Sequence, residues 1–308
     1  MTDAATGQQL VLRREAVGRG WSDDELAALV RRRDWARLRR GAYLAGTLPE
    51  SAATRHLLLV TATLAALRRP AVVSHQSAAV LLGLPLWGAR LDRVHMTRRP
   101  PAWNDSSRLL VAHVARLRND EVTAVNGIEV TTPARTALDL ARSLPFEAAV
   151  VVLDAALHQG VVTPDDLTGG LSDIAGTRGS RAAARAVRLS DGRSESVGES
   201  RSRVVLDRVQ LPPSSLQFEV LAADGHVVAR TDFAWEAQQV VGEFDGKVKY
   251  GRLLRPGQEP GDAVFAEKRR EDAVRDEGWS VVRWTWTDLL RPDQLATRLQ
   301  RAMARSTR

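Results

Sequence analysis

The sequence contains no cysteine, which excludes disulfide bonds and thiolate metal sites and is typical of a protein from a reducing compartment such as the cytoplasm. No apolar run approaches the length of a membrane span and the first residues are polar, so we expect neither a membrane anchor nor a signal peptide. Lysine is also scarce, because only Lys247, Lys249 and Lys268 stand among 44 lysine and arginine residues. A lysine ammonium is a compact charge that arginine does not replace, so these three residues indicate chemistry near the carboxyl end.

The histidines lack the spacing of a metal site. His75, His95 and His113 lie far apart in the sequence, without a pattern such as His-Glu-x-x-His. Ser74 directly precedes His75, but adjacent residues on a helix point apart and no Gly-x-Ser-x-Gly turn surrounds them, so we do not predict a nucleophile–base pair. We interpret these histidines as structural or surface residues.

Positive charge is concentrated at the amino end. The chain has 308 residues, a net charge of +7 and an isoelectric point near 10.7. Residues 1–100 hold 16 arginines and 8 acids, a balance of +8, whereas residues 101–308 hold 28 basic and 29 acidic residues. An acidic partner is therefore predicted for the amino-terminal part, with nucleic acid as the first candidate.

Residues 1–48 have the layout of a winged helix. Gln8–Val17 is predicted as a helix, Ser22 and Glu25 form a capping box that opens a second helix, and Trp35–Leu44 alternates as a hairpin does about Gly41. In this layout the second helix enters the major groove and the hairpin contacts phosphates. The alternative is a solvated arginine face, but six arginines against one aspartate favour DNA binding. The arginines predicted to contact DNA are Arg31, Arg32, Arg33, Arg37, Arg39 and Arg40.

Three stretches resemble the AbiEi-type antitoxins of type IV toxin–antitoxin systems: residues 35–43 (WARLRRGAY), residues 73–85 (VSHQSAAVLLGLP) and residues 132–141 (TPARTALDLA). In that family the amino-terminal winged helix binds operator DNA and represses its own operon. The resemblance implies a DNA-binding module and a cognate toxin as partner.

The segment 51–190 is predicted as a mixed α+β domain of the antitoxin type. Helices are expected over residues 53–66, 74–83 and 146–158, and strands over residues 90–97 and 109–114. Thr132 and Pro133 open a further helix, on which Arg135 and Asp139 have the i, i+4 spacing of an ion pair.

A stretch near the carboxyl end gathers acids on one strand face. Val240–Asp245 is predicted as a strand whose alternation places Glu243, Asp245 and Lys247 on the same face. Asp232 ends the preceding strand and is expected beside Glu243. Carboxylates packed together need a cation, and Mg²⁺ or Mn²⁺ suits such oxygen ligands.

The elements around this strand are predicted in the order α-β-β-β-α-β. In that order, Glu195–Met303 resembles the very-short-patch-repair-like branch of the PD-(D/E)XK nuclease superfamily. The matching residues are Glu199 on the first helix, Asp232 in the second strand, the run Glu243-Phe244-Asp245-Gly246, the basic helix at residues 267–270 and the closing strand at residues 278–284.

The resemblance implies that Glu199, Asp232 and Glu243 hold Mg²⁺ or Mn²⁺, while Asp245 and Lys247 position or activate the attacking water. The superfamily pattern is acid-x-Lys, whereas Glu243 is followed at that spacing by Asp245. Either Lys247 substitutes from the next position on this face, or the register is Asp245-x-Lys247. The phosphate contacts would come from Lys268, Arg269, Arg270 and Arg283.

We therefore predict a mixed α/β protein with a winged helix at 1–48, an α+β middle domain at 51–190 and a restriction-endonuclease-like domain at 194–305. The leading functional hypothesis is a Mg²⁺-dependent DNA endonuclease or nickase, acting alone or with a repair partner. The alternative is a non-enzymatic autorepressor and antitoxin whose nuclease-like domain is inactive.

Overall fold

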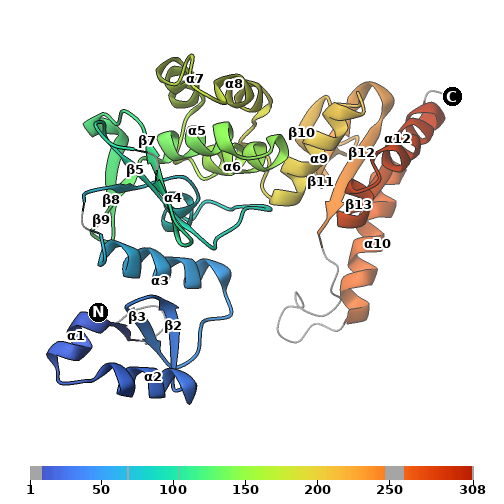
Figure 1. The fold of residues 1–308 in the computed structure, drawn as a ribbon. Coiled ribbons are helices and arrows are strands. Elements are labelled where there is room, and N and C mark those ends of the chain that lie inside the picture. Colours follow the sequence, from blue (N-terminus) through green and yellow to red (C-terminus); the bar gives the residue numbers. More distant parts are fainter. Residues whose placement is uncertain (1–8, 68, 104, 247–259, 307–308) are drawn as a thin grey trace. The chain divides into compact units, whose positions relative to one another are not determined.

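The computed structural model describes residues 9–67, 69–103, 105–246 and 260–306 (Figure 1). The chain divides into two compact units, one of Met1–Leu144 and Asp165–Ser180, the other of Pro145–Pro164 and Arg181–Arg308. Both units combine helices and sheets, which confirms the mixed α/β class. The predicted domain boundaries near residues 50 and 192 stay predictions. In the described ranges, no helix is both long and apolar enough to cross a membrane.

The first unit begins with a three-stranded antiparallel sheet of order β1-β3-β2 and two short helices. Their bounds are β1 (Leu10–Leu12), α1 (Arg13–Gly18), α2 (Asp23–Arg31), β2 (Trp35–Arg39) and β3 (Ala42–Ala45). The predicted hairpin is confirmed as β2 and β3, with Gly41 in the turn at a φ of 79°. The capping box is also confirmed: Ser22 Oγ accepts from the Glu25 amide at 3.2 Å, and a Glu25 carboxylate oxygen accepts from the Ser22 amide at 2.7 Å.

The predicted helix Gln8–Val17 is wrong in its first part, where the chain forms β1 instead. Leu10 pairs with Leu44 of β3. Leu10 packs with Ala42 on one face of the strand, and Val11 packs with Leu26 on the other. Because apolar contacts on both faces and pairing with β3 come from residues distant in sequence, tertiary structure decides the conformation of this stretch.

A six-stranded sheet of order β6-β7-β5-β4-β9-β8 forms the rest of the first unit. Its strands are β4 (Val72–Val73), β5 (Val94–Arg98), β6 (Asp105–Ser106), β7 (Leu110–Val114), β8 (Val122–Val125) and β9 (Ile128–Thr131). The helices are α3 (Ala52–Leu64), α4 (His75–Leu81), α5 (Pro133–Ser143), the 3-10 turn η1 (Asn119–Glu121) and α7 (Pro164–Asp173). Residues of α3, α4 and the central strands share one apolar core.

The predicted ion pair on α5 is confirmed and is buried. Arg135 Nε donates to Asp139 at 2.9 Å, and Arg135 Nη1 lies 2.9 Å from a carboxylate oxygen of Glu121. Burial raises the pKa of Asp139, which the Arg135 guanidinium opposes.

The second unit contains the predicted order α-β-β-β-α-β. Its elements are α6 (Phe146–His158), α8 (Ser180–Leu189), α9 (Val197–Arg208), β10 (Ser215–Leu221), β11 (Val227–Trp235), η2 (Glu236–Gln238), β12 (Val240–Asp245), α10 (Pro260–Asp276), β13 (Ser280–Thr285), α11 (Trp286–Leu289) and α12 (Pro292–Ser306). The sheet has the order β10-β11-β12-β13, antiparallel except for the parallel pair β12 and β13.

The two faces of this sheet are covered by different helices. On one face, Val240 and Trp284 pack with residues of α9 and α12. On the other face, Val241 packs with Val274 of α10. The alternation predicted for β12 is therefore confirmed, and it directs Glu243 toward α10.

Candidate functional site

Glu199 lies near the start of α9 and is held against the sheet of the second unit. Ser196 caps the helix, its hydroxyl accepting from the Glu199 amide at 3.2 Å. A β-carbon on Gly198 would overlap the ring of Phe244 on β12, so glycine permits the close approach of helix and strand. Glu199 is 8% exposed. Its carboxylate accepts hydrogen bonds from the Glu195 amide at 2.9 Å and from the Gln217 side-chain amide at 2.8 Å.

Asp232 and Glu243 face each other on β11 and β12. The register pairs Phe233 with Gly242, and the next step of that register brings Asp232 opposite Glu243. Asp232 Oδ2 accepts from the Phe244 amide at 2.7 Å. Burial raises the pKa of Asp232 to about 7; the hydrogen bond from Phe244 opposes this shift, and the charges of Glu199 and Glu243 add to it. Asp232 is therefore close enough to Glu199 and Glu243 for their charges to act on it.

Two arginines neutralise Glu243. Arg270 of α10 donates to one Glu243 carboxylate oxygen at 2.7 Å. Arg283 Nε of β13 lies 2.9 Å from the other oxygen, without hydrogen-bond geometry, and a terminal nitrogen of Arg283 lies 3.4 Å from Glu271. Both arginines were predicted to contact phosphates, and in this structure their guanidinium groups contact an acid of the predicted metal site.

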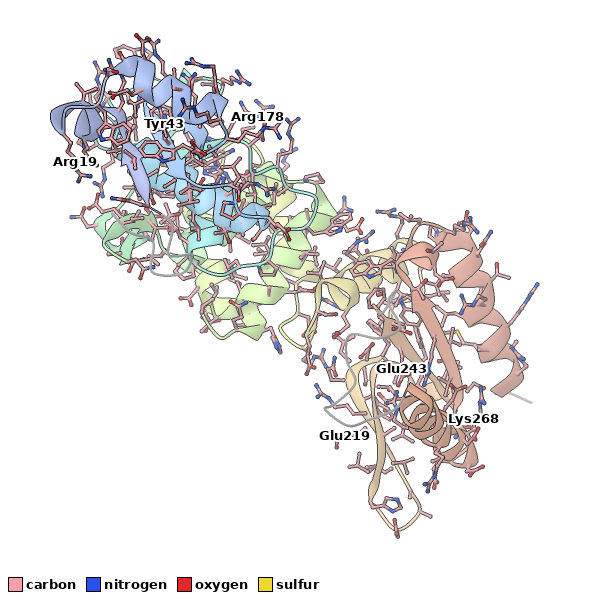
Figure 2. All side chains as sticks on the ribbon, turned by 90° about the horizontal axis from the view of Figure 1, so that it is seen from below. Arg19, Tyr43, Arg178, Glu219, Glu243 and Lys268 are labelled. Atoms are coloured by element: carbon pink, nitrogen blue, oxygen red, sulfur yellow. The ribbon has the colours of Figure 1, made fainter. Side chains whose placement is uncertain are left out.

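The remaining predicted residues of this unit lie at its surface or outside the described residues. Asp245 is exposed at the end of β12. Lys268 and Arg269 are exposed on α10, and Figure 2 labels Lys268 and Glu243 on their elements. Lys247 falls outside the described residues, so its role relative to Asp245 stays a prediction.

Two of the three predicted metal ligands already have other partners in this structure. Among the described residues, no group of three histidine, aspartate or glutamate side chains is arranged to hold a metal ion. Glu199 belongs to the helix on the opposite sheet face and accepts from Glu195 and Gln217, while Glu243 is paired with two arginines. A cation such as Mg²⁺ would have to compete with these partners, so we assign no reaction step to it.

The six amino-terminal arginines belong to the end of α2, the connection after it and the hairpin of β2 and β3. Arg31 ends α2, Arg33 adopts a left-handed conformation with a φ of 63°, and Arg37 lies on β2. Arg39 is half-buried, with its Nε unpaired in the described residues, and burial lowers its pKa. Within the described part of the chain, no ion pair joins any of the six to a carboxylate. The ion pair found nearby joins a different arginine, Arg13, to Asp23. The five arginines other than Arg39 are exposed, so their charges are available to an acidic partner.

The middle of the chain is similar to a known protein family. Residues 71–191 match the AbiEi antitoxin C-terminal domain. The chain is also similar to two proteins of Mycobacterium tuberculosis, "Uncharacterized protein Rv2248" of strain H37Rv and "Uncharacterized protein MT2308" of strain CDC 1551, each 30% identical over 183 residues. That alignment spans 59% of this chain and 64% of each relative, just under two thirds of their length.

The AbiEi-like segment contains a histidine cluster that sequence reasoning missed. The rings of His75 and His113 stack with centroids 3.7 Å apart, and His95 Nδ1 lies 3.1 Å from His113 Nε2. Ser74 joins the cluster through its hydroxyl, 3.0 Å from His75 Nδ1. Spacing along the chain gives no hint of this, but β5 and β7 are parallel neighbours and carry His95 and His113. A correct prediction that these two strands pair would have brought His95 and His113 together.

Proposed function

We propose that this protein is a DNA-binding regulator of the AbiEi antitoxin type. The observation that carries the proposal is the match of residues 71–191 to the AbiEi antitoxin C-terminal domain, preceded in the chain by the six arginines of α2, β2 and their connections. Arginines without carboxylate partners favour phosphate contacts, which position a protein on duplex DNA. The partners proposed are operator DNA upstream of its own gene and a toxin encoded beside it.

Replacing Arg31, Arg32 and Arg33 together by glutamine should weaken binding to a duplex from that upstream region. If all three contact phosphates, the slope of log K against log salt should become shallower by about 2 to 3, because each lost contact removes about one released counterion. Fluorescence anisotropy of the labelled duplex between 50 and 200 mM salt (roughly the range over which such contacts act) measures both quantities.

The matched control removes the same charge from elsewhere in the first unit. Arg90, Arg108 and Arg178 are exposed, and their triple glutamine variant should keep most of the affinity and slope. Equal losses in the two triple variants would show that net charge alone drives binding and would refute a defined DNA surface.

A second candidate function is a metal-dependent nuclease in the second unit. It is favoured by the α-β-β-β-α-β order together with the raised pKa of Asp232 among Glu199 and Glu243. Under this proposal, purified protein nicks supercoiled plasmid with Mg²⁺ or Mn²⁺ and not with EDTA. Asp232→Asn and Glu243→Gln should each abolish nicking, whereas Glu219→Gln, on an exposed position of the same sheet, should retain it.

Either of two results would reject the nuclease proposal. The first is intact plasmid under every metal condition while the protein binds duplex DNA normally. The second is nicking that persists in both the Asp232 and the Glu243 variants, because a contaminating nuclease would then be responsible.

A further inference from the structure

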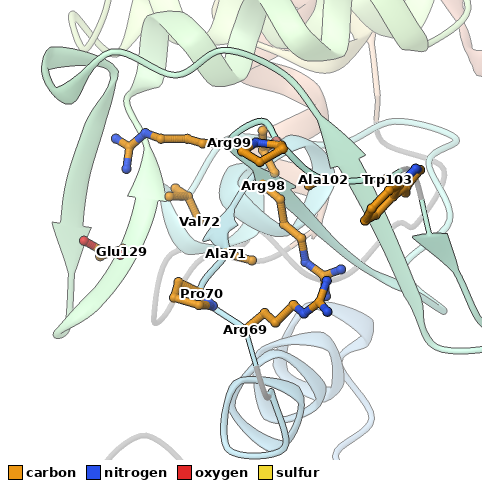
Figure 3. Close-up of a pocket in the computed structure, with 11 residues that line it drawn as sticks. Arg69, Pro70, Ala71, Val72, Arg98, Arg99, Ala102, Trp103 and Glu129 are labelled. Carbon is orange, nitrogen blue, oxygen red and sulfur yellow. The ribbon is translucent and has the colours of Figure 1, made fainter.

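A cavity of about 630 Å³ opens in the first unit, beside the start of β4 and the end of β5 (Figure 3). Its wall includes apolar groups from Pro70, Ala71 and Val72. Arg98, at the end of β5, and Trp103, in the segment after β5, also line the cavity. This volume lies within the range of small-molecule sites, about 300 to 1,000 Å³.

Two arginines in this cavity lack partners in the part of the chain that the structure describes. Arg69 and Arg98 both line it, and in Figure 3 their side chains extend toward the same end. Arg98 Nε is buried with no hydrogen-bond partner. Arg99 differs, since it donates to the Leu117 carbonyl at 2.9 Å and to Asn119 at 3.2 Å. Like charges that point toward the same end of a cavity repel each other, and an anion with several oxygens would accept hydrogen bonds from both guanidinium groups and offset this repulsion.

An exposed aromatic ring belongs to the same cavity. Trp103 is 77% exposed, the most exposed of the large hydrophobic residues in the described part of the chain. A flat exposed ring beside cationic side chains is suited to stack a nucleobase, a contact that accepts any base. Glu129 lines the cavity as well; its carboxylate would repel a phosphate and accept a hydrogen bond from an amino group of the base or from ribose.

We propose that this cavity binds a nucleoside phosphate, with the phosphate held by Arg69 and Arg98 and the base stacked on Trp103. The phosphate can come from a free nucleotide or from the end of a single strand, since both present the same groups. The site uses none of the arginines at residues 31–40, so it goes beyond the proposed binding of duplex DNA and is separable from it.

Isothermal titration calorimetry of the full chain tests this with ATP, with 5′-phosphorylated hexathymidylate and with the same oligonucleotide lacking the phosphate. Arg69→Gln and Arg98→Gln should each weaken binding of the phosphorylated probe about tenfold, the effect of losing one charge-assisted hydrogen bond. Trp103→Ala should weaken it to a similar extent, and Trp103→Phe should restore part of the loss. Arg108→Gln, an exposed arginine outside the cavity, should bind as the unaltered chain does.

The probes also separate the two sources of phosphate. Binding of ATP alone identifies a free nucleotide as the ligand, and binding of the phosphorylated oligonucleotide alone identifies a strand end; both support the site. Absence of binding by both ATP and the phosphorylated oligonucleotide, with the melting temperature of the protein unchanged by either, would overturn the proposal. Equal affinity for the hexathymidylate with and without its 5′-phosphate, where both bind, would also overturn it. So would Arg69 and Arg98 variants that lose affinity only for duplex DNA.

Discussion

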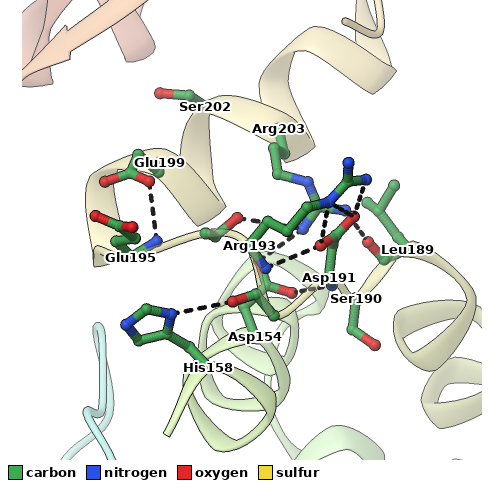
Figure 4. Close-up of polar contacts among 12 residues, drawn as sticks. Asp154, His158, Leu189, Ser190, Asp191, Arg193, Glu195, Glu199, Ser202 and Arg203 are labelled. Carbon is green, nitrogen blue, oxygen red and sulfur yellow. Dashed lines mark hydrogen bonds and ion pairs between the residues drawn. The ribbon is translucent and has the colours of Figure 1, made fainter. Parts of the chain in front are cut away.

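Replacement of Asp154 by alanine should destabilise the second unit by about 3 to 5 kcal/mol, the cost of leaving a buried charge without its partner. Asp154 is fully buried on α6, and Arg203 of α9 donates to it at 2.7 Å (Figure 4). The other Asp154 oxygen accepts from the Asp191 amide at 2.8 Å. Arg203 also donates to the Leu189 carbonyl, so one aspartate–arginine pair joins two helices and the segment between α8 and α9.

The expected loss comes mainly from Arg203, not from the aspartate itself. Arg203 is 9% exposed, so in the alanine variant its charge would stay out of water without its principal counter-ion. Burial raises the pKa of Asp154, and the Arg203 charge opposes this shift. Because Arg203 lies one helical turn after Glu199, the loss should also loosen the helix that presents Glu199.

Urea unfolding of the full chain, with hydrogen exchange of α9 amides as the local measurement, gives the required free energies. The informative control is the double variant Asp154→Leu with Arg203→Met, which removes both charges and keeps apolar volume. It should be closer to the unaltered protein than Asp154→Ala is, because no unpaired charge remains. A single variant that loses less than about 1 kcal/mol would show that water reaches Arg203 and compensates it.

The sequence predicts well those elements whose signals are local. The capping box at Ser22 and Glu25, the turn at Gly41 and the strand alternation at Val240–Asp245 each depend on neighbouring residues, and the structure contains all three. The stretch Leu10–Leu12 shows the limit, because its conformation depends on pairing with β3, whose partner residues lie 30 to 34 positions away.

The candidate site was predictable in position but not in its contacts. Asp232 and Glu243 are adjacent because a short turn joins their strands, a relation that can be deduced from the sequence. Arg270 and Arg283 reach Glu243 from α10 and β13, and no local pattern indicates that these guanidinium groups pair with an acid. The cavity at Arg69, Arg98 and Trp103 was missed for the same reason, since a turn and a strand end form it jointly.

Acidification should destabilise the first unit through the cluster of His75, His95 and His113. Burial lowers the pKa of His95 and of His113 to about 4, and each is further lowered by a neighbouring charge, His113 for His95 and Arg142 for His113. Burial lowers the pKa of His75 well below its usual value of 6.5. Three neighbouring neutral rings can pack together, with His75 stacked on His113, whereas a positive charge on any of them would repel a charge on the others and the nearby arginines.

The direction in which stability changes with pH follows from the number of protons bound in the folded and the unfolded state. Between pH 6.5 and about 4 the unfolded chain binds more protons at these histidines than the folded chain does, so their contribution to stability is present above pH 6.5 and is lost as the pH falls toward 4. Shifts of this size correspond to about 3 kcal/mol for each buried group, but His95 and His113 are partly exposed. We therefore expect about 3 kcal/mol for the pair of them.

Asp139, Asp154 and Asp232 have raised pKa values, so their contribution to stability increases as the pH falls, opposite to that of the histidines. Substitution of a single histidine separates the two contributions. The difference in unfolding free energy between the unaltered chain and His113→Asn should shrink as the pH falls from 7 to 4.5, since the variant has no imidazole to protonate there. A parallel profile for His113→Asn would mean that the cluster accepts protons without opening, and imidazole NMR titration would then find a pKa near 6.5 for His113.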